Sequence, residues 1–86
     1  MAYVQINTEE VREKANAYRR QGEQLGTSIN EMKSLMDVMR EGFKGKTSDA
    51  LNEIFQEMIP SLGKAEQMIA EFAATLNKAA DEFDNL

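Results

Sequence analysis

The stretch VREKANAYRRQGEQLGTSINEMKSLMDVMREGF, residues 11–43, decides the fold. Its apolar and small residues recur at alternating steps of four and three, the heptad spacing of helices that pack side by side. The positions in this series are Val11, Ala15, Tyr18, Gly22, Leu25, Ile29, Met32, Met36, Met39 and Phe43. The spacing predicts one long helix over about residues 8–41.

The second half of the chain repeats this spacing. Its series is Leu51, Phe55, Met58, Leu62, Ala65, Ile69, Phe72, Leu76, Ala79, Phe83 and Leu86. The pattern predicts a second helix over about residues 47–84. Pro60 lies inside it and cannot donate a backbone hydrogen bond to Gln56, so we expect a kink or a break there.

A connector of five residues, 42–46, is short enough to make the two helices antiparallel neighbours. Asn7 with Glu10 fits a capping box at the first helix, and Thr8 is an alternative cap. Gly42 suits the end of that helix, and Thr47 or Ser48 can cap the second. The predicted fold is all-α, a single domain over residues 1–86 in the form of an antiparallel two-helix hairpin.

The two heptad series predict the seam between the helices. Its main side chains are expected to be Val11, Tyr18, Leu25, Ile29, Met32, Met36, Met39, Leu51, Phe55, Leu62, Ile69, Phe72, Leu76 and Phe83. Other apolar residues remain outside or beside this seam, and a small hairpin shields little apolar surface alone. These candidates for partner contacts are Leu35, Val38, Ile54, Met58, Ile59 and Met68. We therefore expect two hairpins to form a four-helix bundle by dimerising.

Composition removes several classes of function. The chain has 86 residues, a formal charge of −5, a pI near 4.7, no Cys and no His. The acidic balance argues against nucleic-acid binding, and the absence of Cys and His removes disulfides and the usual zinc sites. No run approaches ~18 apolar residues, so we expect no stable membrane insertion. The start of the chain has no basic region followed by an apolar one, so we also expect no ordinary secretory signal peptide.

Charge is divided unevenly along the chain. Residues 1–46 carry 8 basic and 7 acidic side chains, a net of +1, whereas residues 47–86 carry 2 and 8, a net of −6. Solvated helix faces explain such a division. A second interpretation is that opposite ends of two antiparallel protomers complement each other.

No motif predicts a catalytic, cofactor-binding or metal-binding residue. Gly45-Lys46-Thr47 resembles the end of a phosphate loop, but Arg40 stands where that motif needs glycine. Turn and cap chemistry explains the triplet better. Neighbouring carboxylates such as Glu9 and Glu10 are explained by solubility and by the helix dipole. We therefore predict a protein that is not an enzyme and needs no cofactor.

The connector carries the most distinctive feature, an aromatic residue and a glycine in Phe43-Lys44-Gly45. The glycine permits a tight reversal of the backbone, and Phe43 could fold onto the second helix near Leu51 and Phe55. With the length, the unbroken heptads and the opening Ile6-Asn7-Thr8-Glu9-Glu10-Val11, this triplet resembles the WXG family of small ESAT-like substrates of type VII (ESX/Ess) secretion systems. Phe43 and Gly45 stand where that family has its Trp-x-Gly turn, and Phe55 and Pro60 fall at spacings common in Gram-positive members.

The resemblance implies a helical hairpin that is exported folded as a dimer, by a route that uses no signal peptide, from the cytoplasm. It also implies that Phe43 and Gly45 form part of the export signal and contact the type VII machinery. The family's C-terminal Tyr-x-x-x-Asp/Glu is missing, since the only tyrosines are Tyr3 and Tyr18. The partner could thus be a second copy, another WXG protein or the N-terminal domain of an LXG-type effector that this chain helps to target. The alternative is an intracellular helical adaptor or structural coiled-coil protein without an export role.

Overall fold

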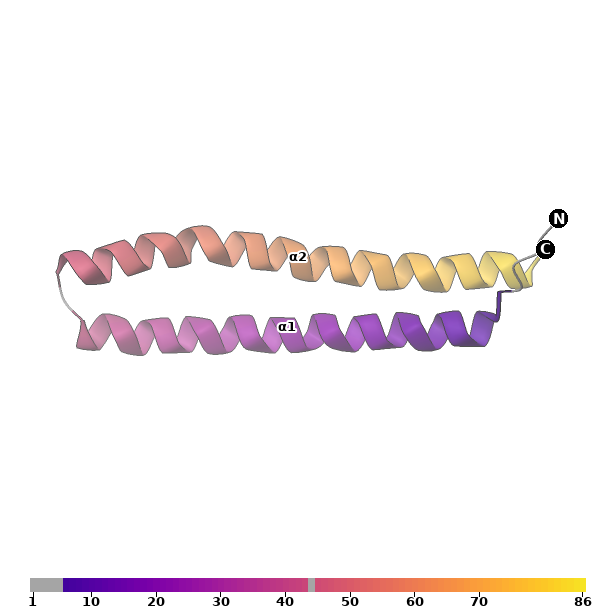
Figure 1. Ribbon diagram of the computed structural model, residues 1–86, viewed down its shortest axis with the longest axis horizontal. Helices are drawn as coiled ribbons and strands as arrows, with labels where there is room; N and C mark the ends of the chain where they lie inside the picture. Colours follow the sequence, from indigo (N-terminus) through magenta and orange to yellow (C-terminus); the bar gives the residue numbers. More distant parts are fainter. Residues whose placement is uncertain (1–5, 44) are drawn as a thin grey trace.

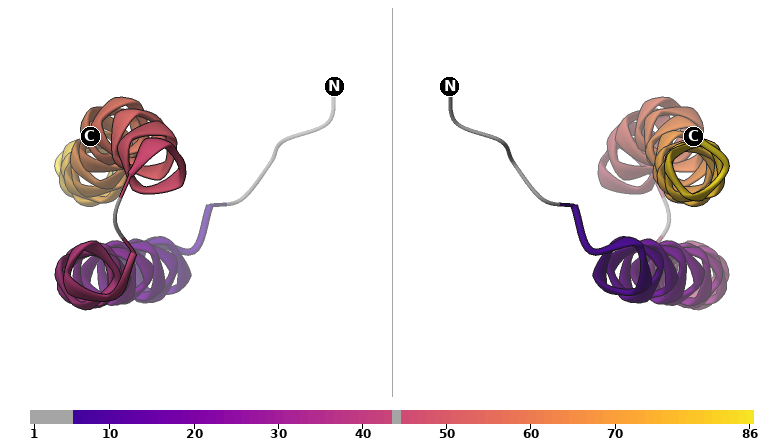
Figure 2. Two further views of the ribbon diagram at one scale, coloured as in Figure 1. Left: turned by 90° about the vertical axis from the view of Figure 1, so that its left-hand side faces the viewer. Right: turned by 90° about the vertical axis from the view of Figure 1, so that its right-hand side faces the viewer.

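The structure is a computed structural model that describes residues 6–43 and 45–86. It consists of two helices, α1 (Thr8–Gly42) and α2 (Lys46–Asp84), which run antiparallel as a hairpin (Figure 1). Within the described residues there is no strand. The all-α hairpin expected from the heptads is therefore confirmed. The end-on views show that the two helix axes cross at a shallow angle (Figure 2), as helices with a heptad seam do.

Helix α1 begins at the cap that its sequence predicts. The Asn7 side-chain oxygen accepts hydrogen bonds from the backbone N–H groups of Glu9 and Glu10, at 3.0 and 3.2 Å. These two residues place negative charge in the first turn, where the helix dipole favours it. Thr8, the alternative cap, is the first residue of the helix.

Helix α2 begins differently from the prediction. Its N-cap is Gly45, which has a φ of 101° and makes no side-chain cap hydrogen bond, so neither Thr47 nor Ser48 is the cap. The positive φ reverses the chain, and only glycine adopts it without strain. The Gly45 carbonyl then accepts the Asp49 N–H at 3.2 Å, which starts the helical hydrogen bonding directly after the turn.

Pro60 does not interrupt α2. The helix is continuous over 39 residues, so a break near Pro60 does not occur. The ribbon of α2 bows away from α1 over its first half (Figure 1). Such curvature is the expected consequence of one missing backbone hydrogen bond inside a helix.

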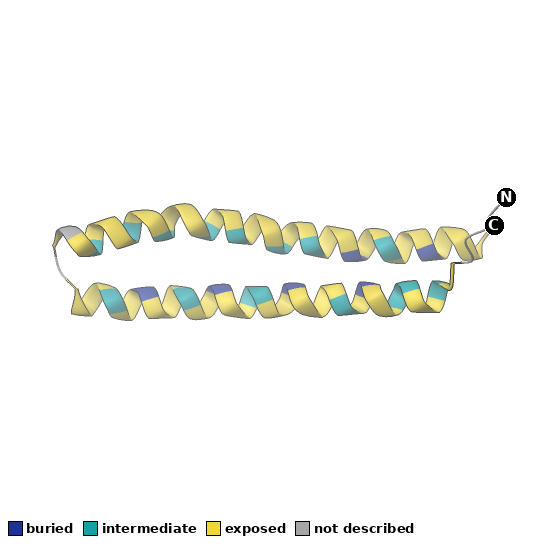
Figure 3. Cartoon of the chain, viewed as in Figure 1, coloured by how far each residue is buried: buried dark blue, intermediate teal, exposed yellow. Residues whose placement is uncertain are grey.

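The core is a narrow line between the helices (Figure 3). Its buried apolar residues are Ala15, Ile29, Met36, Ala73 and Ala80. Small residues predominate towards the open end of the hairpin, where the chain ends lie, and the two ribbons are closer there than around the bow of α2 (Figure 1). The molecule measures 65 × 21 × 18 Å, so it is a rod with little interior.

Candidate functional site

The turn exposes Phe43, one of the two residues for which the family resemblance implied a role in export. Phe43 follows α1 in an extended conformation, and its N–H donates to the Met39 carbonyl at 2.8 Å. Its side chain remains 53% exposed, so the predicted plug against Leu51 and Phe55 is not closed in the single hairpin. The reason is the extended backbone at Phe43, which carries the chain away from α1 before Gly45 reverses it. The side chain is therefore available to another protein.

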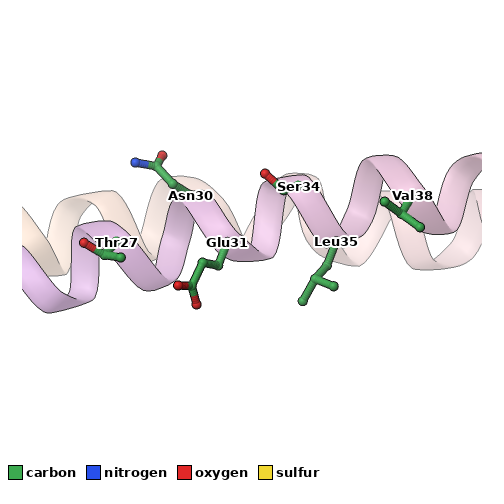
Figure 4. A pocket seen from close by; sticks show the side chains of 6 residues that line it. All are labelled: Thr27, Asn30, Glu31, Ser34, Leu35 and Val38. Atoms are coloured by element: carbon green, nitrogen blue, oxygen red, sulfur yellow. The ribbon is translucent and has the colours of Figure 1, made fainter.

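Close to the turn, α1 exposes two large aliphatic side chains. Leu35 and Val38 are 63% and 67% exposed and line a shallow depression together with Thr27, Asn30, Glu31 and Ser34. Figure 4 shows Leu35 and Glu31 projecting to one side of α1, while Asn30 and Ser34 project to the other. All six residues belong to one helix, so this feature is a surface of α1 and not a cleft between the helices.

Helix α2 exposes a longer apolar line. Ile54 and Met68 are 62% and 58% exposed, and Leu51, Met58 and Phe72 are also exposed. Residues three, four and seven positions apart lie on one side of a helix. Leu51, Met58 and Phe72 are separated by multiples of seven, and Ile54 and Met68 lie between them by the same rule. The line thus follows one flank of α2 from the turn to beyond the middle of the hairpin.

The aromatic residue at the end of this line also contacts α1. The rings of Tyr18 and Phe72 meet edge to face, with centroids 4.8 Å apart and an interplanar angle of 83°. Beside them runs an apolar groove between the helices, lined by Ile6, Asn7, Glu10, Val11, Lys14, Tyr18, Phe72 and Leu76. On α1, Met32 and Met39 continue the heptad line that includes Tyr18. Leu35 lies three residues from Met32 and four from Met39, so it adjoins this line.

These residues form one broad surface, which we call the apolar face. Its members are Tyr18, Leu35, Leu51, Ile54, Met58, Met68 and Phe72.

The other side of the hairpin is polar. The Arg12 guanidinium of α1 lies between two carboxylates of α2, at 2.8 Å from Asp81 and 2.7 Å from Asp84. Hydrogen bonds from Arg12, and secondarily from Thr8, lower the pKa of the Asp84 carboxyl below its ordinary value. The same two carboxylates raise the pKa of Arg12. This cluster connects the start of α1 to the end of α2.

A second polar feature of this side is a small depression between the helices, lined by Arg19, Gly22, Glu23, Glu66 and Ala70. The Glu66 carboxylate lies over Gly26, and a Cβ atom built on Gly26 would be only 2.7 Å from its Oε2. Glycine at this position therefore makes room for a polar side chain at the edge of the seam.

The seam in α1 follows the predicted positions, whereas the seam in α2 is displaced. In α1, Val11, Leu25, Met32 and Met39 are half-buried, and Ile29 and Met36 are buried. In α2, Phe55, Leu62, Ile69 and Leu76 are half-buried, but the other seam positions are one residue later than predicted. The displaced positions are Asn52, Ile59, Glu66, Ala73 and Ala80, in place of Leu51, Met58, Ala65, Phe72 and Ala79.

This displacement corrects several predicted roles. Leu51 and Phe72, predicted for the seam, are exposed on the apolar face. Ile59, predicted for partner contacts, is half-buried in the seam. Tyr18 and Phe83 are 45% and 41% exposed, so they only border the seam. The other predicted contact residues, which are Leu35, Val38, Ile54, Met58 and Met68, are all exposed.

Sequence analysis missed the polar residues that adjoin the seam. The Arg12 cluster joins residues 69 and 72 positions apart, so no local spacing could reveal it. Asn52 and Glu66 occupy seam positions that a search for apolar residues passes over. The Asn52 Oδ1 atom is buried and has no hydrogen-bond partner, which makes this the least satisfied point of the described seam.

Among the described residues, no group of three or more acidic side chains could hold a metal ion, and neither helix is long and apolar enough to cross a membrane. The distinguishing property of the molecule is an apolar face on one side and a polar face on the other.

Comparison with known proteins connects this hairpin to one family. The sequence model of WXG100, described as proteins of 100 residues with WXG, matches residues 4–86. The chain is also 25% identical over 81 residues to the type VII secretion system extracellular protein A of Staphylococcus aureus strain USA300, a match that covers 94% of this chain and 84% of the relative.

Solved structures share the fold. The secreted protein EsxB of Bacillus anthracis strain Sterne has a TM-score of 0.90 at 19% identity, with 100% of both chains covered. EsxA of Geobacillus thermodenitrificans has a TM-score of 0.86 at 20% identity, covering 99% of this chain and 91% of the other. At these identities the similarity establishes the hairpin fold.

Proposed function

The chain belongs to the WXG100 family, and from this membership we propose that it is a non-enzymatic substrate of a type VII secretion system, exported as a folded helical dimer. The observation that carries the proposal is the family match over residues 4–86, which includes both helices and the turn. The name of the Staphylococcus aureus relative, a type VII secretion system extracellular protein, supports the assignment to this pathway.

The apolar face supports the part of the proposal that concerns a partner. A hairpin that leaves side chains such as Ile54 and Met68 more than half exposed is expected to bury them against another helical surface. In this proposal the partner of the hairpin completes a four-helix bundle. The bundle is then the folded unit that leaves the cytoplasm without a signal peptide.

The turn supports a role in recognition by the secretion machinery. Phe43 is half exposed and Gly45 fixes the reversal with its positive φ, so the turn presents an aromatic side chain in a defined position at one end of the rod. We assign these two residues to the export epitope.

The test is export of the double variant Phe43→Ala, Gly45→Ala from a native host with an active type VII system. We expect strongly reduced protein in the culture supernatant at an unchanged cellular level. Gly63→Ala is the matched control, because this glycine lies within α2, away from the turn, with open space around its Cβ position. Helicity of the purified double variant shows whether the hairpin persists without the turn residues.

Undiminished export of the double variant would refute the role of the turn. A wild-type chain that never reaches the supernatant, while other substrates of the same system do, would refute the secretion function. That second outcome would favour the alternative, an intracellular helical adaptor or structural coiled-coil protein.

A second candidate is that the chain pairs with the N-terminal helical domain of an LXG-type effector and helps to target it. The supporting observation is the apolar face, where Ile54 and Met68 are 62% and 58% exposed and which the helical domain of such an effector would cover. Co-expression with such a domain, followed by size-exclusion chromatography, tests this candidate. A complex of one hairpin with one effector domain supports it, and separate elution rejects it.

A further inference from the structure

The polar side of the hairpin carries a line of basic residues on α1. Its positions are seven residues apart, so they follow one side of the helix. They are Arg12, Arg19, Gly26, Lys33 and Arg40. Gly26 is the one uncharged position of the line, and the Glu66 carboxylate of α2 lies over it. Helix α2 therefore adds a negative charge to the middle of a basic line.

The charges along this line alternate in sign. The Arg12 guanidinium lies between two carboxylates of α2, so one positive and two negative charges leave this position negative. Arg19 is positive, with a side chain that is 62% exposed and a loose ion pair at 3.9 Å. Glu66 is negative, and Lys33 is positive, exposed and in no ion pair within the described residues. From Arg12 towards the turn the order is negative, positive, negative, positive.

The outer edge of α2 carries the opposite order of charges. Its residues are also seven apart, and each stands two positions before a seam residue, about 200° round the helix from the seam. They are Glu57, Lys64, Glu71 and Lys78, and all four are exposed. In the part of the chain that the structure describes, none of them forms an ion pair, although Glu71 accepts a hydrogen bond of 3.4 Å from Gln67. From Lys78 towards the turn the order is positive, negative, positive, negative.

From these two lines we propose that the polar side of α1 binds the outer edge of α2 of a second copy of this chain, with the two helices antiparallel. Every position then meets an opposite charge, which gives such a contact its specificity. The pairs are the Arg12 cluster with Lys78 of the partner subunit, Arg19 with Glu71 of the partner subunit, Glu66 with Lys64 of the partner subunit, and Lys33 with Glu57 of the partner subunit. If α2 ran the other way, the three central pairs would remain, but Lys78 of the partner subunit would lie beside Arg40.

The proposed contact requires almost no shift along the long axis. Gly26 is level with Glu66 in the hairpin itself, and in the contact it is level with Lys64 of the partner subunit. The difference is two residues, or about 3 Å along a helix. Because α1 and α2 are antiparallel in both copies, the two turns lie at the same end. The arrangement is thus a sideways repeat of the hairpin, in which each copy offers α1 to one neighbour and α2 to another.

The polar side gives the second helix room to approach. The depression beside Arg19 contains Gly22 and Ala70, and the space around the Cβ position of Gly63 is open. Single exposed ion pairs stabilise little, so the four must act together, and we expect association only at high protein concentration. The contact leaves the apolar face free, so this inference goes beyond the proposed function and does not depend on it.

The first experiment uses the lack of native cysteine to test which residues meet. Asn30 lies between Gly26 and Lys33, and Ser61 lies between Glu57 and Lys64, so Asn30→Cys of one copy should face Ser61→Cys of the other. A short bismaleimide should therefore join the two variants in an equimolar mixture at least fivefold more than it joins either variant to itself. The products are distinguished by mass.

The control for this cross-link moves one cysteine round the same helix. Gln24 is exposed and stands two residues from Gly26, so it points away from the polar side. Gln24→Cys mixed with Ser61→Cys should give no excess of the mixed product. An equal excess with Gln24→Cys would show random collision and overturn the contact.

The second experiment reverses one charge pair in these cysteine chains. Arg19→Glu and Glu71→Lys each set like charges against each other, so we expect either one, present in both chains, to lower the yield of mixed product at least threefold. The double variant restores the pair and the net charge of the chain, so its yield should return to within twofold of the original. Arg20→Glu and Glu13→Lys make the same changes in net charge at exposed positions outside the line, and each should alter the yield less than twofold.

The outcomes separate this inference from the proposed function. An excess of mixed product that each single reversal lowers and the double reversal restores establishes the contact. No excess in the mixture overturns the contact, and a double variant that stays low overturns the charge pairing. Helicity of each variant shows that the hairpin persists. Export to the supernatant is measured independently, so a chain that is exported but gives no mixed product keeps the secretion function and rejects this contact.

Discussion

At the scale of single residues, glycine and alanine determine how closely the helices approach. Ala15 and Gly22 of α1 are buried towards the open end of the hairpin, as are Ala73 and Ala80 of α2. A Cβ atom on Gly22 would be 3.1 Å from the Ile69 Cγ2 atom, closer than ordinary packing allows. Relief of this contact takes a shift of a few tenths of an ångström, and the β-branched Ile69 side chain has few other rotamers with which to make it.

The first prediction compares two glycines inside helices. Gly63→Ala places its Cβ in open space, so it should stabilise the hairpin by about 0.5–1 kcal/mol through helix propensity alone. Gly22→Ala gains the same propensity but must displace Ile69, and overpacking typically costs about 1–3 kcal/mol. We expect Gly22→Ala to be the less stable variant by at least about 1 kcal/mol in urea denaturation. Equal stability of the two would show that the helices can separate freely at Gly22.

The second prediction concerns the Arg12 cluster and its dependence on pH. The pKa of Asp84 is lowered in the folded state, so its stabilising effect is complete well above the ordinary value of 3.8 and is lost as pH falls through the lowered pKa. Asp84→Asn should therefore lower the thermal midpoint by a few degrees at most at pH 7, because the groups are exposed. The difference from the wild type should vanish in strong acid.

Thermal melts of Asp84→Asn and the wild type from pH 7 to about pH 2 measure this effect. Glu82→Gln removes an exposed carboxylate from the same turn and serves as the control. A difference that persists unchanged at the lowest pH would mean that Asp84 acts through something other than its charge.

At the scale of the helices, the sequence predicted both helices but not which of two neighbouring heptad lines of α2 faces α1. The heptad spacing was sufficient to predict both helices and their antiparallel arrangement, because these depend only on local periodicity and a short connector. The rotation of α2 about its axis depends on packing against α1, which the spacing within α2 does not contain. In the structure Glu66 is half-buried with its carboxylate over Gly26, so one seam position of α2 is polar. A pattern search that favours the most apolar line chooses the neighbouring one, with Met58 and Phe72.

The residues of the candidate site were also only partly predictable from the sequence. Exposed aliphatic residues such as Leu35 and Ile54 could be identified because they lie off both heptad series. Phe72 could not be assigned to the apolar face, since an aromatic residue at a seam position is ordinarily expected to be buried. The third prediction follows from this difference.

The third prediction compares adjacent residues, Ile59 and Met58. Ile59→Ala removes a half-buried side chain from the seam, so we expect it to destabilise folding by about 1–3 kcal/mol. Met58→Ala acts on the exposed apolar face, so the hairpin itself should lose less than about 1 kcal/mol, while association weakens. Urea denaturation in dilute protein and sedimentation at high concentration separate the two effects. A larger loss of folding stability in Met58→Ala than in Ile59→Ala would support the seam predicted from the sequence.

At the scale of the whole molecule, shape and charge act together. The radius of gyration is 19.5 Å, compared with about 12 Å expected for a compact domain of this length. The described residues form a rod with little interior, so its long sides and its ends are the surfaces that it presents to other molecules. The long sides differ in polarity, and the two halves of the chain differ in charge, since residues 1–46 have a net charge of +1 and residues 47–86 a net charge of −6.

The fourth prediction uses this charge difference to distinguish the two ways of pairing hairpins. If two hairpins pack antiparallel through the apolar face, each α2 lies beside α2 of the second copy, so two segments of net charge −6 repel each other and the charges do not complement each other as the sequence suggested. Salt screens charges over about 8–10 Å at physiological strength. The dimer dissociation constant should therefore fall, roughly threefold to tenfold, between about 20 and 300 mM NaCl. With the turns at the same end, α2 would instead lie beside α1 of the partner, which is nearly neutral, and salt would have little effect or weaken the dimer. Sedimentation equilibrium across this salt range measures whether the dimer tightens or weakens as salt is added. Only the antiparallel arrangement, in which like-charged helices lie side by side, is expected to tighten.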